Sequence, residues 1–330
     1  MIKSSKKVLI TGATGFIGSH IVEFCVEKGF DVVAFDRYNP NNHWGWLEDS
    51  DYKNDIKVIL GDIRDYDSVS KAMQNCYAVF HMAALISIPY SYVSPLAYIR
   101  TNVEGTYNVL EAAKNSELEQ ILVTSTSETY GTAQYVPIDE KHPLVGQSPY
   151  SASKIAADQL TISYYKSFEL PVKLVRPFNT YGPRQSARAI IPTIISQLLN
   201  GKTEIELGSL SPTRDLTFVQ DTCRGFEEIY KSEILFGEVI NIGMKAEISI
   251  EDLAKLIASI MNLELSIEST DERIRPENSE VERLFCDNAK LLKHTQWKPN
   301  YTLVQGINEV VEWMKKPENM NYFKSDKYNV

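Results

Sequence analysis

The chain has 330 residues, of which 43% are hydrophobic and 23% charged, and its formal net charge is −9. This composition is typical of a globular protein, and the acidic balance argues against nucleic acid or an anionic membrane surface as a partner, since both require a basic surface. Apolar runs of 18 or more residues are absent, and the four cysteines are scattered without a CxxC pair. We therefore expect a cytoplasmic protein with reduced cysteines, no membrane span and no metal site.

The first predicted elements surround a glycine-rich turn. Residues 6–20 read K-K-V-L-I-T-G-A-T-G-F-I-G-S-H, an apolar strand that leads through Gly12, Gly15 and Gly18 into a helical pattern. Such glycines let the backbone approach a pyrophosphate, which binds at the helix N-terminus. The next strand ends at Asp36, at the offset where a carboxylate binds an adenosine ribose. Asp36 would repel a 2′-phosphate, so the sequence predicts NAD rather than NADP, although the adjacent Arg37 is what a 2′-phosphate prefers.

Alternating strands and helices follow along the chain. Strands are predicted at 57–62, 78–84 and 121–125, and a helix at about 95–114. Alternation of this kind implies right-handed crossovers and a parallel sheet, so we expect an α/β protein with a Rossmann-type, doubly wound sheet. His81 lies near the end of the strand at 78–84, where a ligand-binding residue is often found. A histidine that is packed in the core or caps an element is more common at such a position.

A tyrosine and a lysine begin the helix predicted at about 149–167. Ser148 is its candidate N-cap, and Tyr150 and Lys154 lie one turn apart on the same face. This YxxxK match is the only one in the chain, and it follows a strand that ends near Thr126. Ligands bind at the carboxyl ends of parallel strands, and an ammonium lowers a nearby tyrosine pKa. The sequence therefore predicts that Tyr150 takes a proton from a sugar hydroxyl during hydride transfer to NAD, with Thr126 holding the same oxygen.

Several motifs together resemble one family. G-A-T-G-F-I-G, Thr126 and Y-S-A-S-K are similar to the extended short-chain dehydrogenase/reductases, which include nucleotide-sugar 4-epimerases and 4,6-dehydratases. R-P-F-N-T-Y-G-P-R-Q at 176–185, R-D-L-T-F-V-Q-D at 214–221, and Arg275 followed by W-K-P-N-Y-T-L match the family's substrate half in order. The resemblance implies an NAD-binding domain at 1–177 with a returning segment at about 215–243. It also implies a smaller, interwoven substrate-binding domain at 178–214 and 244–330.

The resemblance also implies a set of site residues. The implied NAD site comprises Gly12, Gly15, Phe16, Ile17, Gly18, Asp36, Arg37, Asp62, Ile63, Ala83, Ala84, Asn102, Thr124, Tyr150, Lys154 and Pro177. The implied substrate site comprises Ser87, Thr126, Asn179, Arg188, Arg214 and Arg275, with Asn179 at the sugar diphosphate and Arg214 and Arg275 on its phosphates. Family members usually dimerise through two helices, here those at about 95–114 and 149–167, so we expect a homodimer.

Glu128, within T-S-T-S-E-T-Y-G at 124–131, separates two activities of the family. In 4-epimerases the two residues after the strand-end Ser or Thr are typically small or neutral, whereas 4,6-dehydratases commonly have Asp-Glu there. Ser127 and Glu128 depart from Asp-Glu and resemble the Thr-Ser-Glu of GDP-mannose 4,6-dehydratases. We predict Thr126, Ser127, Glu128, Tyr150 and Lys154 as the catalytic set, with Glu128 removing the C5 proton. The acid that protonates the leaving hydroxyl stays open, and the alternative is a capping or ion-paired Glu128 in a 4-epimerase.

The substrate is suggested by stretches outside the general family pattern. Residues 39–48, 86–92, 131–144 and 185–192 resemble the 4,6-dehydratases of the legionaminic acid pathway, which act on GDP-N-acetylglucosamine. By that resemblance Ser87 lines the sugar pocket and Arg188 lies near the base. Whether the base of the substrate nucleotide is guanine or uracil stays open. A 4-epimerase that acts on a UDP-N-acetylhexosamine is the alternative function. A nucleotide-sensing module without catalysis is a further alternative, against which the complete catalytic set argues.

Overall fold

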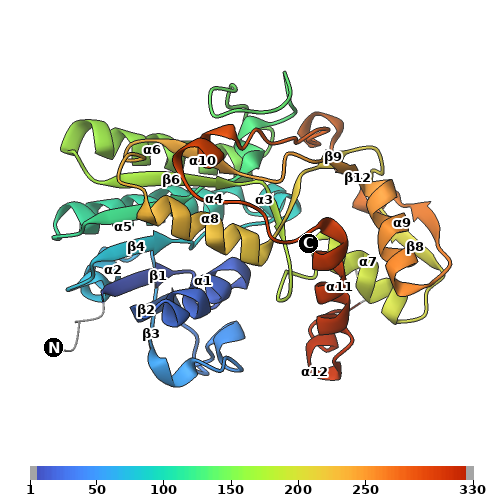
Figure 1. Cartoon of the computed structure of the whole chain (residues 1–330), viewed down its shortest axis with the longest axis horizontal. Helices are drawn as coiled ribbons and strands as arrows, with labels where there is room; N and C mark the ends of the chain where they lie inside the picture. Colours follow the sequence, from blue (N-terminus) through green and yellow to red (C-terminus); the bar gives the residue numbers. More distant parts are fainter. Residues whose placement is uncertain (1–5, 325–330) are drawn as a thin grey trace.

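A seven-stranded parallel sheet forms the centre of the computed structural model. The structure describes residues 6–324. The predicted domains also include residues 1–5 and 325–330, which lie outside this range. The strand order is β11-β6-β5-β4-β1-β2-β3 (Figure 1). The strands are β1 (Lys7–Thr11), β2 (Asp31–Arg37), β3 (Ile56–Gly61), β4 (Ala78–His81), β5 (Gln120–Thr124), β6 (Val172–Pro177) and β11 (Val239–Ile242). The reversal of strand order between β1 and β4 is that of a doubly wound sheet, so the predicted fold class is confirmed.

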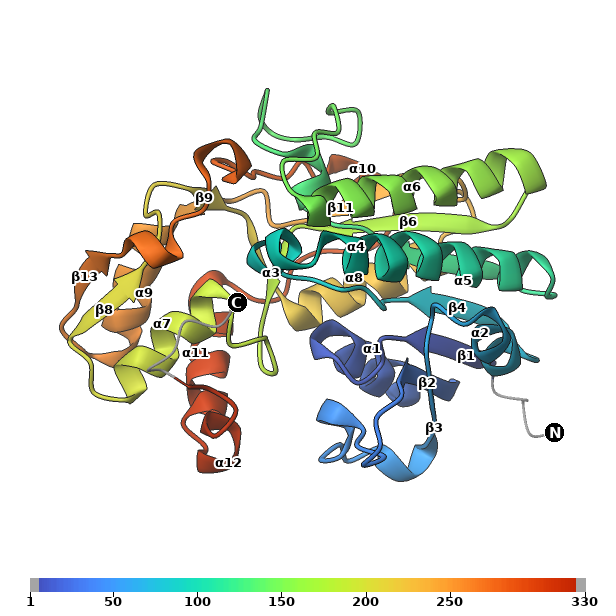
Figure 2. The same ribbon diagram turned by 180° about the vertical axis from the view of Figure 1, so that it is seen from behind.

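Helices cover both faces of this sheet, which explains why its strands are apolar throughout. Alternate residues of β1 point to opposite faces: Val8 and Ile10 lie in one core and Leu9 in the other. The first core is covered by α1 (Phe16–Glu27) and α8 (Val219–Lys231), and the second by α2 (Tyr66–Met73), α5 (Gly105–Lys114) and α6 (Pro149–Phe168). Figure 2 shows the second layer in front of the sheet.

Two predicted elements differ from the structure in detail. The strand predicted at 78–84 ends at His81; the Met82 backbone N–H still donates to the Thr11 carbonyl of β1, and regular strand pairing is not continued beyond it. The helix predicted at 95–114 consists of α4 (Pro95–Tyr98), a π-helical turn (Ile99–Glu104) and α5. The wider turn places Asn102 on the buried side of the segment.

Residues after β6 build a second lobe beside the carboxyl ends of the strands (Figures 1 and 2). It contains α7 (Ile190–Leu199), α9 (Ile250–Met261), α11 (Leu303–Met314) and α12 (Pro317–Met320), with α10 (Ala289–His294) nearer the sheet. Three short strand pairs join it: β7 (Asn179–Tyr181) with β10 (Leu216–Phe218), β9 (Thr213–Arg214) with β12 (Ile248–Ser249), and β8 (Glu204–Leu207) with β13 (Ser266–Ser269). The segment at 215–243 returns to the sheet as α8 and β11, while the two-domain division stays a prediction.

The remaining short helix, α3 (Ile88–Val93), precedes α4 and lies beside the N-terminal end of α6. All four cysteines are buried and unpaired, as the sequence predicts. Within residues 6–324, no helix combines the length and the apolar character needed to cross a membrane.

Candidate active site

A cavity of about 640 Å³ opens at the carboxyl ends of the central strands, where the sheet meets the second lobe. It brings together most of the predicted site residues. Those that line it are Gly12, Gly15, Phe16, Ile17, Gly18, Asp36, Ala83, Ala84, Ser87, Thr124, Thr126, Ser127, Glu128, Tyr150, Lys154, Pro177, Asn179, Arg188, Arg214 and Arg275. The residues predicted for the dinucleotide and those predicted for the sugar nucleotide therefore line the same cavity.

The glycine-rich turn forms a cradle for a dinucleotide at one end of the cavity. Gly12 has φ +66°, and a Cβ there would stand 2.7 Å from the Ala83 backbone, so only glycine fits. Gly15 precedes α1, whose free N–H groups and dipole face the cavity and suit a pyrophosphate. The Asp36 carboxylate accepts bonds from the Thr14 amide and hydroxyl, both at 2.7 Å, which fixes it beside the turn. These residues fit the predicted NAD.

Four predicted NAD residues do not line the cavity. Arg37 is the last residue of β2 and Asp62 follows β3, near the far edge of the sheet. Hydrogen bonds from Arg64 hold the pKa of Asp62 below its usual value. Ile63 packs against Gly105 of α5.

Asn102, the fourth of these residues, does not line the cavity but forms hydrogen bonds with the segment that follows β4. Its side chain bonds both the amide and the carbonyl of Leu85, at 2.7 and 3.0 Å, and also the Ser153 hydroxyl at 2.9 Å. Asn102 thus fixes the wall that Ala83 and Ala84 contribute to the cavity.

His81 is a packed histidine, as expected from its place in a buried strand. It is hydrogen-bonded to the Thr11 and Thr106 hydroxyls at 2.8 and 3.0 Å. Burial lowers the pKa of His81 to about 3, so the ring is neutral at physiological pH.

The Tyr150–Lys154 pair is fixed by the start of α6. Ser148 caps the helix reciprocally with Ser151, which places Tyr150 in the first turn and Lys154 one turn later. Lys154 Nζ donates to the Thr124 carbonyl at 2.7 Å, at the end of β5. Burial raises the pKa of Tyr150 and lowers that of Lys154, while the Thr126 side chain acts to lower the tyrosine pKa. Burial of the phenol has the largest effect, so the Tyr150 pKa lies above its ordinary value, and its lowering by the Lys154 ammonium stays a prediction.

A buried ion pair that the sequence did not suggest lies beside this pair. Arg176 of β6 donates to the Asp158 carboxylate of α6 at 2.7 Å, and the Ser125 hydroxyl donates to the same oxygen at 2.6 Å. All three side chains are almost fully buried. They tie α6 to the ends of β5 and β6, and so hold Lys154 near Thr124.

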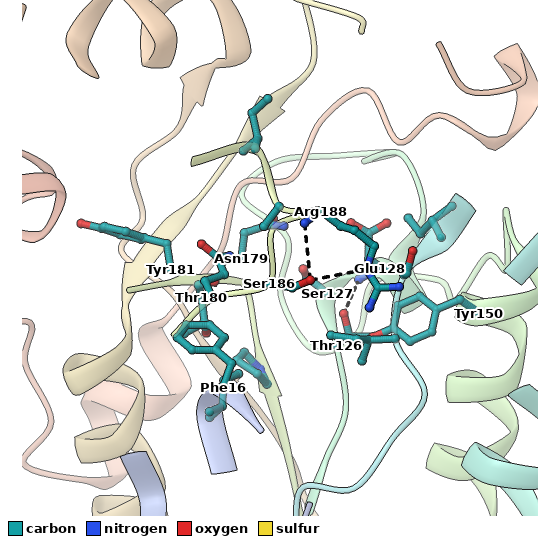
Figure 3. Close-up of a pocket in the computed structure, with 18 of the residues that line it drawn as sticks. Phe16, Thr126, Ser127, Glu128, Tyr150, Asn179, Thr180, Tyr181, Ser186 and Arg188 are labelled. Atoms are coloured by element: carbon teal, nitrogen blue, oxygen red, sulfur yellow. Dashed lines mark hydrogen bonds between the residues drawn. The ribbon is translucent and has the colours of Figure 1, made fainter. Parts of the chain in front are cut away.

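Glu128 is buried in the wall of the cavity. It lies in a short 3₁₀ turn, Ser127–Tyr130, capped by Thr126, whose hydroxyl accepts the Glu128 amide at 3.3 Å. The residue is 8% exposed, and within residues 6–324 its Oε2 has no hydrogen-bond partner. Figure 3 shows Glu128 and Thr126 near the ring of Tyr150. An ionisable oxygen without a partner in a cavity wall is more typical of a functional group than of a structural one.

The predicted substrate residues lie in the same cavity. Arg214 and Arg275 both donate to one oxygen of Glu280, at 3.0 and 3.2 Å. Asn179 begins β7, and its Oδ1 is buried without a partner in the described chain. Arg188 bonds the Ser186 hydroxyl through its Nε at 3.4 Å (Figure 3).

Ser87 has a strained backbone, with φ +90°, at the start of α3. The Tyr98 hydroxyl lies 2.6 Å from the Ser87 carbonyl and 2.8 Å from that of Ile86, which holds this turn against the cavity.

Sequence reasoning missed several residues of the cavity wall. Thr14, Gln185, Ser186, Arg273 and Glu280 all line it. Thr14 and Gln185 stand inside motifs that were recognised, whereas Glu280 carried no signal of its own because acidic residues are frequent in this chain.

Comparison with known proteins agrees with this geometry. The GDP-mannose 4,6 dehydratase family matches residues 9–310. The dTDP-D-glucose 4,6-dehydratase of Mus musculus is 31% identical over 94% of this chain and 89% of that protein. DesIV, a dTDP-glucose 4,6-dehydratase from Streptomyces venezuelae with NAD bound, is 26% identical with a TM-score of 0.86, covering 97% of this chain and all of that one.

A solved epimerase is equally similar in fold. The UDP-glucuronic acid 4-epimerase of Bacillus cereus, in complex with UDP-glucuronic acid and NAD, is 28% identical with a TM-score of 0.85, covering 94% of this chain and 99% of that one. NAD is thus the cofactor in both solved relatives, in agreement with the prediction. Because the family match spans the dinucleotide cradle, the Tyr150–Lys154 pair and the second lobe, this chain belongs to the nucleotide-sugar 4,6-dehydratase and 4-epimerase family of extended short-chain dehydrogenase/reductases.

Proposed function

We propose that the chain is an NAD-dependent 4,6-dehydratase, a hydro-lyase that converts a nucleotide-activated sugar to its 4-keto-6-deoxy derivative. The observation that supports this best is the buried Glu128 in the cavity wall beside Thr126, whose Oε2 finds no hydrogen-bond partner among residues 6–324. A 4-epimerase needs no second base, whereas dehydration requires a group that removes the proton at C5.

The residues of the cavity suit each proton transfer. NAD, when bound in the glycine cradle, supplies the redox chemistry that turns the C4 alcohol into a ketone. Tyr150 accepts the C4 hydroxyl proton, and the Thr126 hydroxyl, whose oxygen already accepts the Glu128 amide, holds the same substrate oxygen. Lys154, held by the Thr124 carbonyl, supplies the positive charge that favours tyrosinate.

Glu128 then removes the C5 proton, which the C4 ketone has made acidic. The C6 hydroxyl leaves as water and needs a proton. Glu128 supplies it directly, or through the Ser127 hydroxyl or a water, since Ser127 lines the cavity next to it. The C5=C6 double bond left by this elimination is then reduced: hydride from the bound cofactor returns to C6, and a solvent-derived proton adds to C5, which gives the 4-keto-6-deoxy sugar and regenerates oxidised cofactor. Each such proton transfer contributes about 10² to 10⁴-fold to the rate.

We further propose GDP-N-acetylglucosamine as the substrate, for legionaminic acid-type surface glycan synthesis in the cytoplasm. Support comes from the stretches at 86–92 and 185–192, which resemble dehydratases of that pathway and contribute Ser87 and Arg188 to the cavity wall. Arg214 and Arg275 lie together in the same wall and suit the diphosphate. UDP-N-acetylglucosamine is the alternative nucleotide sugar.

A 4-epimerase is the second candidate function. It is favoured by Ser127, which is neutral where dehydratases commonly carry an acid, and by the similarity to the Bacillus cereus 4-epimerase. In that case the substrate is a UDP-N-acetylhexosamine, and the product is an isomer.

Mass spectrometry of the products from GDP-N-acetylglucosamine, UDP-N-acetylglucosamine and GDP-mannose in heavy water tests the proposal. We expect loss of one water and gain of one deuterium at C5 with the GDP-N-acetylglucosamine substrate. A product of unchanged composition would establish the epimerase instead. The Glu128→Gln variant is the matched control, because it keeps the side-chain shape and removes the base.

A further inference from the structure

Glu280 joins the two arginines that face the proposed diphosphate. One oxygen, Oε1, accepts Arg214 Nη2 at 3.0 Å and Arg275 Nη1 at 3.2 Å, and all three side chains line the cavity. Arg214 and Glu280 are only 8% and 9% exposed, so solvent screens their charges weakly.

The carboxylate cannot easily withdraw from the arginines, because its segment is fixed on several sides. The Glu280 carbonyl accepts Gln147 Nε2 at 3.2 Å, and its amide donates to the Pro276 carbonyl at 3.1 Å. The preceding Ser279 donates to the Gln147 carbonyl at 2.7 Å, and the Thr213 amide donates to the Glu282 carbonyl at 2.9 Å. An anion that reaches the arginines therefore meets a carboxylate that stays in place.

The two arginines and Glu280 together carry less positive charge than a bound diphosphate carries negative charge. Arg214 and Arg275 bring two positive charges, and Glu280 cancels one of them. A diphosphate that contacts the remaining N–H groups of the same guanidinium ions comes within about 5 to 7 Å of the Glu280 carboxylate, a range at which like charges in a poorly screened site repel appreciably. The same contacts stabilise the protein before substrate binds, since a buried arginine without a partner is costly.

We propose that Glu280 is an affinity-determining residue of the diphosphate subsite, an internal counter-ion that shares the two arginines with the substrate and weakens nucleotide binding. This inference rests on the proposed function and deepens it. Its consequence for turnover is faster release of the product, whose diphosphate is the same as that of the substrate.

Binding of GDP and of UDP to the NAD-loaded protein, measured by isothermal titration calorimetry, tests the inference. For Glu280→Gln we expect a Kd at least about tenfold lower than that of the wild type at low salt, with the difference shrinking as salt rises. The unfolding temperature of the variant without nucleotide should fall, because Arg214 loses its charged partner. A role in shaping the fold alone would lower the stability and weaken binding together.

Three further variants complete the experiment. Glu280→Asp keeps the charge and is expected to retain nearly the wild-type Kd, while Glu280→Ser, a second neutral variant, should shift the Kd in the same direction as Glu280→Gln. Glu247→Gln is the matched control, since Glu247 is paired with Arg283 at 3.0 Å outside the cavity and should change stability without changing the Kd. If wild type binds and both neutral variants bind equally well or more weakly, the inference is wrong while the proposed function stands. If the wild type binds neither nucleotide, the proposed function fails and the inference with it.

Discussion

Glu128 and Tyr150 line the same cavity, but burial and hydrogen bonding affect the two groups differently as proton acceptors. Tyr150 is 9% exposed, and burial keeps its phenol protonated, so it needs positive charge beside it to act as a base. Glu128 has an oxygen without a partner, which leaves a lone pair available to a substrate. The same structural setting, a turn at the end of β5 facing the first turn of α6, thus offers two proton acceptors to adjacent carbons of a sugar.

At this residue scale we predict that Glu128→Gln lowers kcat by about 10² to 10⁴-fold, equivalent to roughly 3 to 5 kcal/mol. Oxidation at C4 should still occur, because Tyr150, Thr126 and Lys154 are unchanged. Steady-state assays and the near-ultraviolet absorbance of reduced cofactor measure the two effects separately. Glu140→Gln is the control, since this half-buried carboxylate accepts the Asn241 amide outside the cavity and should affect stability alone. A Glu128→Gln variant of normal rate would remove Glu128 from the catalytic set.

At the scale of elements, α11 shows how the second lobe shapes the cavity without entering it. Gly306 lets this helix approach the strand pair β7–β10 closely, since a Cβ there would stand 2.1 Å from the Tyr181 hydroxyl and 2.9 Å from the Phe218 ring. Tyr181 is also one of the residues that line the cavity. The contact between helix and strands therefore sets the position of a cavity wall.

We predict that Gly306→Ala destabilises the protein by about 1 to 2 kcal/mol, because an overpacking cost of roughly 1 to 3 kcal/mol exceeds the gain of up to about 1 kcal/mol in helix propensity. Urea unfolding measures the difference. The control is Asn308→Ala on the exposed side of the same helix, which should change stability by no more than a few tenths of a kcal/mol. Equal stability of Gly306→Ala and wild type would mean that α11 shifts freely on the strands.

At the scale of the whole molecule, the buried His81 and the partly buried His20 couple stability to pH. Burial lowers the pKa of His20 to about 4 and that of His81 to about 3, whereas an unfolded histidine has its ordinary value of 6.5. Their contribution to stability is complete above pH 6.5 and is lost as the pH falls, because only the unfolded chain then binds the protons. Asp215 acts in the opposite direction: burial raises its pKa to about 6, so the folded chain binds this proton first.

We predict that the free energy of unfolding decreases as the pH falls from about 6 to about 4. Each histidine lowers it by about 1.4 kcal/mol per pH unit, and Asp215 raises it by about the same amount, so that it cancels the effect of one histidine. Urea unfolding of wild type and His81→Gln across this range tests the assignment. The stability difference between the two proteins should narrow by about 1.4 kcal/mol for each unit that the pH falls. A constant difference would show that His81 is not the group responsible.

Association of two chains stays a prediction for the whole molecule. Val93 at the end of α3, Leu96 in α4 and Ile99 just after α4 are more than half exposed in the single chain, at 70%, 55% and 53%. Because the helices at 95–114 and 149–167 lie side by side, we expect these surfaces to meet in a homodimer. Analytical ultracentrifugation that finds only a 37.4 kDa species would contradict this.

The sequence by itself determined the features that depend on neighbours in the chain: the glycine cradle, the capped start of α6, the single-turn spacing of Tyr150 and Lys154, and the apolar strands of a two-sided sheet. These follow from local backbone geometry, which acts over a few residues. Only the tertiary structure decided that Arg214 meets Glu280, 66 positions away, and that Arg176 is buried against Asp158. The tertiary structure also leaves the Oε2 of Glu128 buried with no hydrogen-bond partner in the part of the chain that the structure describes. It also decided that Arg37, Asp62, Ile63 and Asn102 lie away from the cavity wall. Burial and charge pairing depend on which distant segments the fold brings together, and no local pattern carries that information.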